Sequence, residues 1–169
     1  AISGKGSHWA VGGSAYYSAA DKAFNFDQSD DYIQTGAGVI SGTNPIFSIS
    51  LWVNYSGTGS ETFCMIGDTY GTNTTVWCDA ADGNQKPRMN FINNDVSFTD
   101  PNTGLGALVP GVWNHLVYVF NGTPNGGRSA YVNGVKQVAS AESGTSADGN
   151  LVLPSSSVIT IGALDHSSG

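Results

Sequence analysis

Aromatic rings and side-chain amides in predicted loops are the residues of this chain best suited to bind a ligand. A flat ring can stack on the apolar face of a pyranose sugar, and amide groups hydrogen-bond its hydroxyls. Five residues form the candidate ligand-binding set: Tyr70, Asn73, Trp77, Asn94 and Phe98. Each one alone is more often a packing residue, so the prediction concerns the set, as a rim or sheet face that binds glycan.

Trp52 is a further aromatic residue with two interpretations. Residues 46–55 alternate, with Phe47, Ile49 and Leu51 toward one side and Trp52 among polar residues on the other. Trp52 would be a ligand platform if its ring were exposed to solvent. We favour packing against a second layer, because a tryptophan usually buries most of its large surface.

The acidic residues lack the pair that glycoside hydrolysis requires, in which one carboxyl donates a proton and the other attacks or activates water. The chain has two glutamates, Glu61 and Glu142, and neither has a second carboxylate at a suitable spacing. The histidines, His8, His115 and His166, lie far apart in sequence without a metal-ligand pattern. We therefore predict that the protein is not an enzyme, and that His115 is half-buried in a strand and bonded to backbone or to a neighbouring strand.

Composition excludes several classes of partner. The net charge is −7 with only six lysines and arginines, so the basic surface that nucleic-acid binding needs is missing. No apolar run is long enough to span a bilayer, which predicts no membrane insertion. Charged residues make up only 11% of the chain, and small polar residues are abundant. That composition is typical of an all-β extracellular protein; because residues 1–5 are not a signal peptide, we expect a removed leader or another export route.

The two cysteines, Cys64 and Cys78, fall in a predicted hairpin formed by residues 60–67 and 74–80. A symmetric hairpin centred on Gly71 places them opposite each other, where a cross-strand bridge can form. We favour a Cys64–Cys78 disulfide because the composition is extracellular. The alternative is two free thiols, buried as small apolar residues.

The strongest structural signal is a three-stranded meander in residues 112–140. An apolar run at 112–120 is rich in β-branched and aromatic residues, and shorter strands follow at 129–132 and 135–138. Asn133-Gly134 between the two short strands predicts a type I′ turn, because both central positions of that turn need positive φ. The meander indicates an antiparallel all-β fold.

Further strands are predicted at regular intervals, and no long helix is. Residues 23–27 and 32–34 are expected to pair across a turn at 28–30, as are 89–92 and 96–98 across 93–95; 151–153 and 158–162 are the last strands. This spacing predicts a two-sheet antiparallel β-sandwich. Its expected core residues are Phe47, Ile49, Leu51, Leu116, Tyr118, Phe120 and Val132.

Four segments form a recognisable series along the chain: Ala23–Ile33, Phe47–Val53, the Trp113-x-His115 strand with Tyr131–Val135, and Ile159–Gly162. Together and in this order they resemble the laminin G-like module of the concanavalin A-like jelly-roll superfamily. The resemblance covers about residues 24–162 and implies the jelly-roll sandwich. It leaves function open, because the shared residues are mostly scaffold.

The resemblance also implies a calcium ion at the rim of the sandwich, held by carboxylate and backbone oxygens. Asp30 and Asp31 are the best candidate ligands, followed by Asp79 with Asp82. An alternative of equal weight is that Asp30 and Asp31 cap backbone N–H groups in a solvated turn.

The family's usual closing strand is missing after Gly162, which predicts an open sheet edge. We assign residues 1–20 to an N-terminal arm or linker and 21–169 to the sandwich, and expect the arm around Trp9 to Tyr17 to pack at that edge or on a neighbouring subunit. The predicted function is a non-catalytic extracellular or cell-surface module that binds carbohydrate or a surface ligand. The alternative is a structural or decoration subunit of a virion or extracellular appendage, with a homo-oligomer or neighbouring subunits contacted through the arm.

Overall fold

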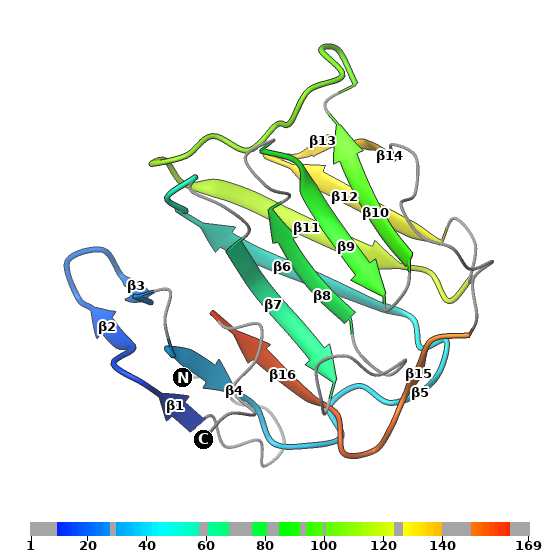
Figure 1. Cartoon of the computed structure of the whole chain (residues 1–169), viewed down its shortest axis with the longest axis horizontal. Coiled ribbons are helices and arrows are strands. Elements are labelled where there is room, and N and C mark those ends of the chain that lie inside the picture. Colours follow the sequence, from blue (N-terminus) through cyan, green and yellow to red (C-terminus); the bar gives the residue numbers. More distant parts are fainter. Residues whose placement is uncertain are drawn as a thin grey trace.

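The long alternating segments pair with one another to form the first of two sheets. The computed structural model describes residues 10–27, 30–57, 61–67, 76–80, 85–91, 94–99, 101–123, 127–139 and 150–162. Within these ranges no helix is present. The first sheet has the order β13 (Val135–Lys136), β12 (Arg128–Val132), β11 (Asn114–Phe120), β6 (Phe47–Val53), all antiparallel (Figure 1). The predicted meander is therefore confirmed, and its turn has φ of 50° at Asn133 and 83° at Gly134, as a type I′ turn requires.

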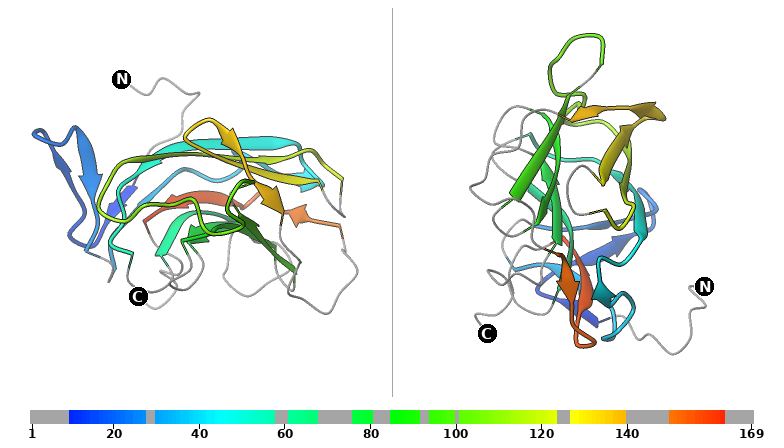
Figure 2. Two further views of the ribbon diagram at one scale, coloured as in Figure 1. Left: turned by 90° about the horizontal axis from the view of Figure 1, so that it is seen from above. Right: turned by 90° about the vertical axis from the view of Figure 1, so that its right-hand side faces the viewer.

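The second sheet has eight strands, and every pairing in it is antiparallel. Its order is β1 (Ala10–Gly12), β4 (Tyr32–Gln34), β16 (Val158–Ile161), β7 (Glu61–Gly67), β8 (Val76–Ala80), β9 (Pro87–Phe91), β10 (Asn94–Thr99), β14 (Val138–Ala139). Two small ribbons complete the described elements: β5 (Gly42–Thr43) pairs with β15 (Val152–Leu153), and β2 (Tyr16–Ser18) pairs with β3 (Ala23–Asn25). Figure 2 shows the two large sheets as stacked layers, with the β2–β3 ribbon projecting at one end.

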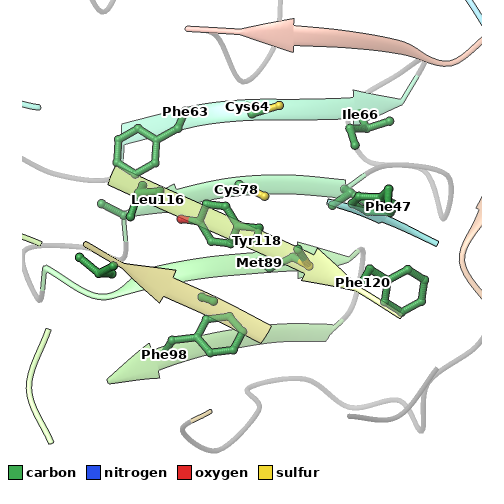
Figure 3. Packing of buried hydrophobic residues seen from close by; sticks show 14 of the residues in the cluster. Phe47, Phe63, Cys64, Ile66, Cys78, Met89, Phe98, Leu116, Tyr118 and Phe120 are labelled. Atoms are coloured by element: carbon green, nitrogen blue, oxygen red, sulfur yellow. The ribbon is translucent and has the colours of Figure 1, made fainter. Parts of the chain in front are cut away.

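The core lies between the two sheets and is filled by alternate residues of each strand. Side chains of β11 and β6 meet those of β7, β8 and β9 across this layer (Figure 3). The predicted core is confirmed: Phe47, Leu116, Tyr118, Phe120 and Val132 are buried, and Ile49 and Leu51 are partly buried against them. The predicted β-sandwich is confirmed as well.

A β-bulge adds a residue to the core from β7. Thr62 pairs with Asp79 and Cys64 with Cys78, so Phe63 between them has no partner on β8. Because a bulge interrupts the alternation of faces, Phe63 and Cys64 both point into the core although they are neighbours.

One predicted pairing is wrong, and one predicted strand is divided between the two sheets. The residues of β3 pair with β2, and β4 pairs instead with β1 and β16. The predicted strand 135–138 is split at Gln137, because β13 stays in the first sheet while β14 pairs with β10 of the second. Gln137 is buried at this crossing, and its backbone N–H donates to the Ala130 carbonyl at 2.9 Å.

The N-terminal segment contributes an edge strand to the second sheet. In β1, Ala10 to Gly12 pair with Gln34 to Tyr32. Of the arm expected to pack at a sheet edge, Ala10 to Gly12 do so, whereas Tyr16 and Tyr17 are exposed on the β2–β3 ribbon and Trp9 lies outside the described residues. No helix in the described part of the chain is long and apolar enough to cross a membrane.

Candidate functional site

Three aspartates converge in the connection between β3 and β4. Asp27, Asp30 and Asp31 each bring one carboxylate oxygen to within 4.8 Å of the others. Asp31 is 3% exposed, whereas Asp27 and Asp30 are exposed. The structure thus places the two predicted metal ligands side by side and adds Asp27 as a third candidate ligand. The spacing Asp-x-x-Asp-Asp in the sequence could have indicated this third residue.

Asp31 also organises the backbone around this cluster. Its carboxylate accepts a hydrogen bond from the Ser14 backbone N–H on one oxygen and from the Asp27 N–H, at 2.7 Å, on the other. Asp31 therefore accepts backbone N–H groups, as the alternative interpretation expected, although its side chain is buried rather than in a solvated turn. By accepting these hydrogen bonds, the Asp31 side chain links Ser14, which precedes β2, to Asp27, which follows β3.

Gly13 lets the arm pass close to the aspartates. Its φ is +64°, and a Cβ there would lie 2.5 Å from Asp31 Oδ1 and 2.6 Å from the Asp30 carbonyl oxygen. Both distances are too short for a side chain, so this position requires glycine. The N-terminal segment and the aspartate loop therefore form one local structure.

The three carboxylates suit calcium in chemistry and in spacing. Ca²⁺ prefers oxygen ligands at about 2.3–2.6 Å, so two ligands of one ion lie within about 5 Å of each other. A separation of at most 4.8 Å meets that limit. The two oxygens of Asp31 each accept one N–H and keep a further lone pair.

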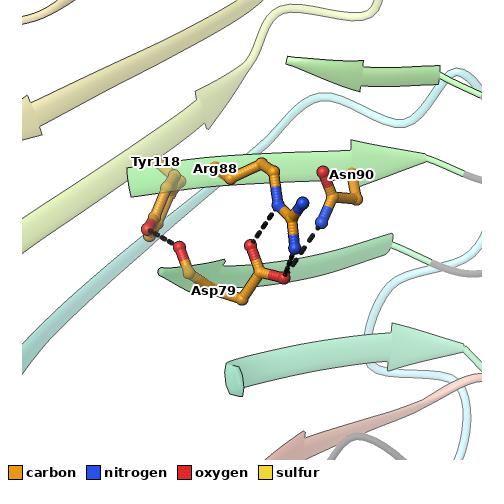
Figure 4. Close-up of polar contacts among 4 residues, drawn as sticks. All are labelled: Asp79, Arg88, Asn90 and Tyr118. Atoms are coloured by element: carbon orange, nitrogen blue, oxygen red, sulfur yellow. Dashed lines mark hydrogen bonds and ion pairs between the residues drawn. The ribbon is translucent and has the colours of Figure 1, made fainter. Parts of the chain in front are cut away.

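A second polar cluster lies on the outer face of β8 and β9, beside Trp77. Arg88 makes a two-pronged ion pair with Asp79, with Nε to Oδ1 at 2.8 Å and Nη2 to Oδ2 at 2.6 Å. Asn90 Nδ2 donates to the same carboxylate at 3.2 Å (Figure 4). Asn90 Oδ1 is buried without a hydrogen-bond partner. Because Asp79 is engaged by these groups, it is a weaker calcium candidate than Asp30 and Asp31; Asp82 lies outside the described residues.

The described members of the predicted ligand-binding set lie on β8 and β10, two strands separated by β9. Trp77 is half-buried on β8, opposite Met65 on one side and Asn90 on the other. The backbone of Asn94, in β10, pairs with that of Phe91, in β9. Tyr70 and Asn73 lie outside the described residues. The prediction that Phe98 contacts a ligand is wrong. Its side chain is 1% exposed and belongs to the hydrophobic core, where it is unavailable to a ligand.

The prediction that Trp52 packs against a second layer is also wrong. Its side chain is 63% exposed on the outer face of β6 rather than packed under a second layer. Its ring stacks on that of His115. His115 itself matches the prediction, since it is half-buried and its Nε2 lies 3.0 Å from Ser50 Oγ on the neighbouring strand.

The two cysteines lie opposite each other, as predicted, but the bond between them is not formed. Cys64 pairs with Cys78 across β7 and β8, and both are free and buried. Burial raises the pKa of the Cys64 thiol to about 12 and also raises that of Cys78. Because the thiolate is the reactive form, both side chains are poor substrates for oxidation and behave as small apolar core residues.

Comparison with protein-family models places most of the chain in one family. A laminin G family model, described as "Concanavalin A-like lectin/glucanases superfamily", matches residues 27–168. The match begins at Asp27, the first of the three aspartates. A search of curated proteins found no match.

Proposed function

Because the chain belongs to the concanavalin A-like lectin/glucanases superfamily, we propose that it is a non-catalytic module that binds carbohydrate or a surface ligand outside the cell. Members of this superfamily commonly bind carbohydrates or other ligands. Calcium held by Asp27, Asp30 and Asp31 assists this binding. The convergence of the three carboxylates within 4.8 Å is the observation that carries the calcium-assisted form of the proposal.

Electrostatics supports a cation at this position. Three carboxylates at this separation repel one another, and a divalent ion between them converts the repulsion into attraction. The ion would also link the loop before β4 to the N-terminal segment through Asp31 and its bond from Ser14. Calcium would therefore fix the rim of the sandwich, and would supply no reactive group.

The placement of Glu61 and Asp79 supports binding rather than hydrolysis. Glu61 closes a loop by accepting hydrogen bonds from Ser56 Oγ and from the Gly57 N–H at 3.1 Å. Asp79 is held in its ion pair with Arg88. A glycosidase requires one carboxyl poised to give up a proton and another facing the sugar carbon, and neither of these residues is placed for that task.

A glycan array probed with and without EDTA tests the proposal. We expect the wild-type protein to bind a subset of glycans and EDTA to weaken the signal. Asp30→Asn should reproduce the effect of EDTA, whereas Asp21→Asn, which removes an exposed carboxylate of the β2–β3 turn, should not. Binding that is indifferent to both EDTA and Asp30→Asn would refute the calcium role, and a blank array with calcium present would refute carbohydrate recognition.

A second candidate function, a structural or decoration subunit of a virion or appendage, is favoured by the projecting β2–β3 ribbon. Tyr16, Tyr17 and Phe24 on this ribbon are 61%, 55% and 43% exposed, and Tyr17 packs only edge-on to Phe24 with centroids 5.5 Å apart. Exposed aromatic clusters of this kind commonly mark contact surfaces between subunits. Sedimentation of the wild type against a Tyr16→Ser/Tyr17→Ser/Phe24→Ser variant tests it: an oligomer lost in the variant supports assembly, and a monomer in both cases contradicts it.

A further inference from the structure

The outer face of the four-stranded sheet carries an exposed aromatic pair that neither the core nor the aspartate cluster uses. Trp52 of β6 and His115 of β11 are direct cross-strand partners. Their rings stack with centroids 4.9 Å apart and planes inclined at 29°. Trp52 is 63% exposed. Tryptophan is highly buried on average in folded proteins, so its packing does not explain its place here.

Contacts around His115 hold this pair in position. The imidazole Nε2 lies 3.0 Å from Ser50 Oγ, and the His115 backbone N–H donates to Asn133 Oδ1 at 2.9 Å. Both rings stand on strands that pair along their full length, from Phe47–Phe120 to Val53–Asn114. A ring fixed in this way loses little conformational freedom when a ligand binds, which favours binding.

The outward side chains near Trp52 are small polar groups on β6 and, beyond His115, the valines Val117 and Val119 on β11. β6 is the last strand of its sheet, so no further strand of that sheet flanks the indole on this side. Along the outer face of β6, Ser48 and Asn54 are exposed on either side of Trp52 and Ser50. The outward residues of β6 and β11 carry no carboxylate or ammonium group. This surface therefore matches a neutral ligand with one apolar face and several hydroxyls.

We propose that Trp52, with His115 and Ser50, is a contact site for a neutral pyranose residue of a glycan. The C–H groups on one face of the sugar lie against the indole, while the hydroxyl of Ser50 and the amide of Asn54 bond to its hydroxyls. The inference rests on the proposed carbohydrate function and assigns it to a definite place. That place is the outer face of the four-stranded sheet, whereas Trp77 lies on the outer face of the other sheet.

The indole N–H signals in a nitrogen–proton correlation spectrum report on this site directly. The chain has four tryptophans, and Trp52→Phe and Trp77→Phe variants identify the two signals that matter. Titration with neutral oligosaccharides of glucose, galactose, mannose and N-acetylglucosamine should shift the Trp52 signal and leave that of Trp77 in place. Trp52→Ala should weaken binding about tenfold or more, and Trp52→Phe should weaken it less.

A matched control separates this site from general surface effects. Leu105 is 66% exposed, so Leu105→Ala removes a similarly exposed apolar side chain elsewhere and should leave affinity unchanged. The remaining indole signals of Trp52→Ala should keep their positions, which verifies its fold. A glycan that shifts Trp77 and binds Trp52→Ala normally would overturn the inference while the proposed function stands. If no neutral glycan shifts any indole signal at millimolar concentration, the inference is overturned, and a blank array would overturn the proposed function with it.

Discussion

Asp79 and Arg88 show how single residues on the outer face of the second sheet are held in place. The Asp79 side chain is 3% exposed and that of Arg88 is 20% exposed, so the pair is largely removed from water. Burying a charge is costly unless a partner and hydrogen bonds compensate it. Here two bonds from Arg88 and one from Asn90 do so.

Arg88→Met should therefore lower the free energy of unfolding by about 3–5 kcal/mol, because it leaves the Asp79 carboxylate buried without its counter-charge. The double variant Asp79→Asn/Arg88→Met should cost clearly less, since neither charge then remains. Urea unfolding of the three proteins provides the measurement. Equal losses in the single and double variants would contradict a compensated buried pair.

Cys64 and Cys78 should resist alkylation in the folded protein, because burial raises the pKa of both thiols and keeps them protonated. After denaturation without reductant, titration should find two free thiols. Blocking all accessible thiols before denaturation serves as the control. Finding no thiol in the denatured protein would contradict two free cysteines and show that Cys64 and Cys78 are bonded to each other.

Among the elements, the segment from β1 to β4 depends on close backbone contacts rather than on a hydrophobic stripe. Gly12 faces the ring of Tyr32, where a Cβ would overlap it, and Gly13 lies against Asp30 and Asp31. Asp31 then bonds to backbone on both sides of the β2–β3 ribbon, at Ser14 and Asp27. The aspartate cluster and the edge strand β1 therefore depend on each other for their stability.

Gly13→Ala should lower the free energy of unfolding by more than about 1 kcal/mol, because alanine is strained at a φ of +64° and its Cβ meets Asp31. The same substitution should weaken calcium binding. Gly104→Ala is a matched control for the strain alone, since its φ is +70° and a Cβ there meets nothing within 4 Å. Calorimetric calcium titration and urea unfolding give both readouts; an effect no larger than that of Gly104→Ala would contradict the close packing of Gly13.

The sequence predicts the long elements better than the short ones, for a physical reason. β6 and β11 each have seven residues, enough for alternation to mark a buried face, and Asn133-Gly134 marks a local turn. β3 and β4 have three residues each, which is too short for alternation to mark a face. β3 pairs with the preceding strand β2, and β4 pairs with β1 and the distant β16, so periodicity does not select their partners. The bulge at Phe63 and the burial of Phe98 likewise depend on the packing of the two sheets.

The candidate sites were predictable to different degrees. Asp30 and Asp31 are adjacent in the sequence, so their proximity needs no tertiary information. The pairing of Trp52 with His115 and the exposure of its ring depend on which strands are neighbours and on β6 lying at the end of its sheet. Those facts come only from the assembled fold.

For the whole molecule, the buried titratable groups of the core predict loss of stability in alkali. Burial raises the pKa of Cys64 from 9.0 to about 12 and raises those of Cys78 and Tyr118 well above their ordinary values. The unfolded chain therefore loses these protons first as the pH rises, so deprotonation favours unfolding. The free energy of unfolding should stay at its full value below pH 9.0 and fall as the pH rises toward about 12.

Urea unfolding at neutral pH and across this alkaline range measures the effect. The variant Cys64→Ala/Cys78→Ala removes two of the titrating groups, so its stability should fall less steeply with pH than that of the wild type. Identical slopes for the two proteins would contradict the role of the thiols.

The whole molecule is expected to bind a glycan without transforming it. The decisive measurement is calorimetric titration of the strongest array glycan into the protein with calcium present, followed by chromatography of the same mixture. We predict saturable heat of binding, its reduction by EDTA, and recovery of the glycan intact with no new reducing ends. Release of shorter sugars by protein free of contaminating hydrolases, or the absence of any binding heat, would refute a non-catalytic glycan-binding module.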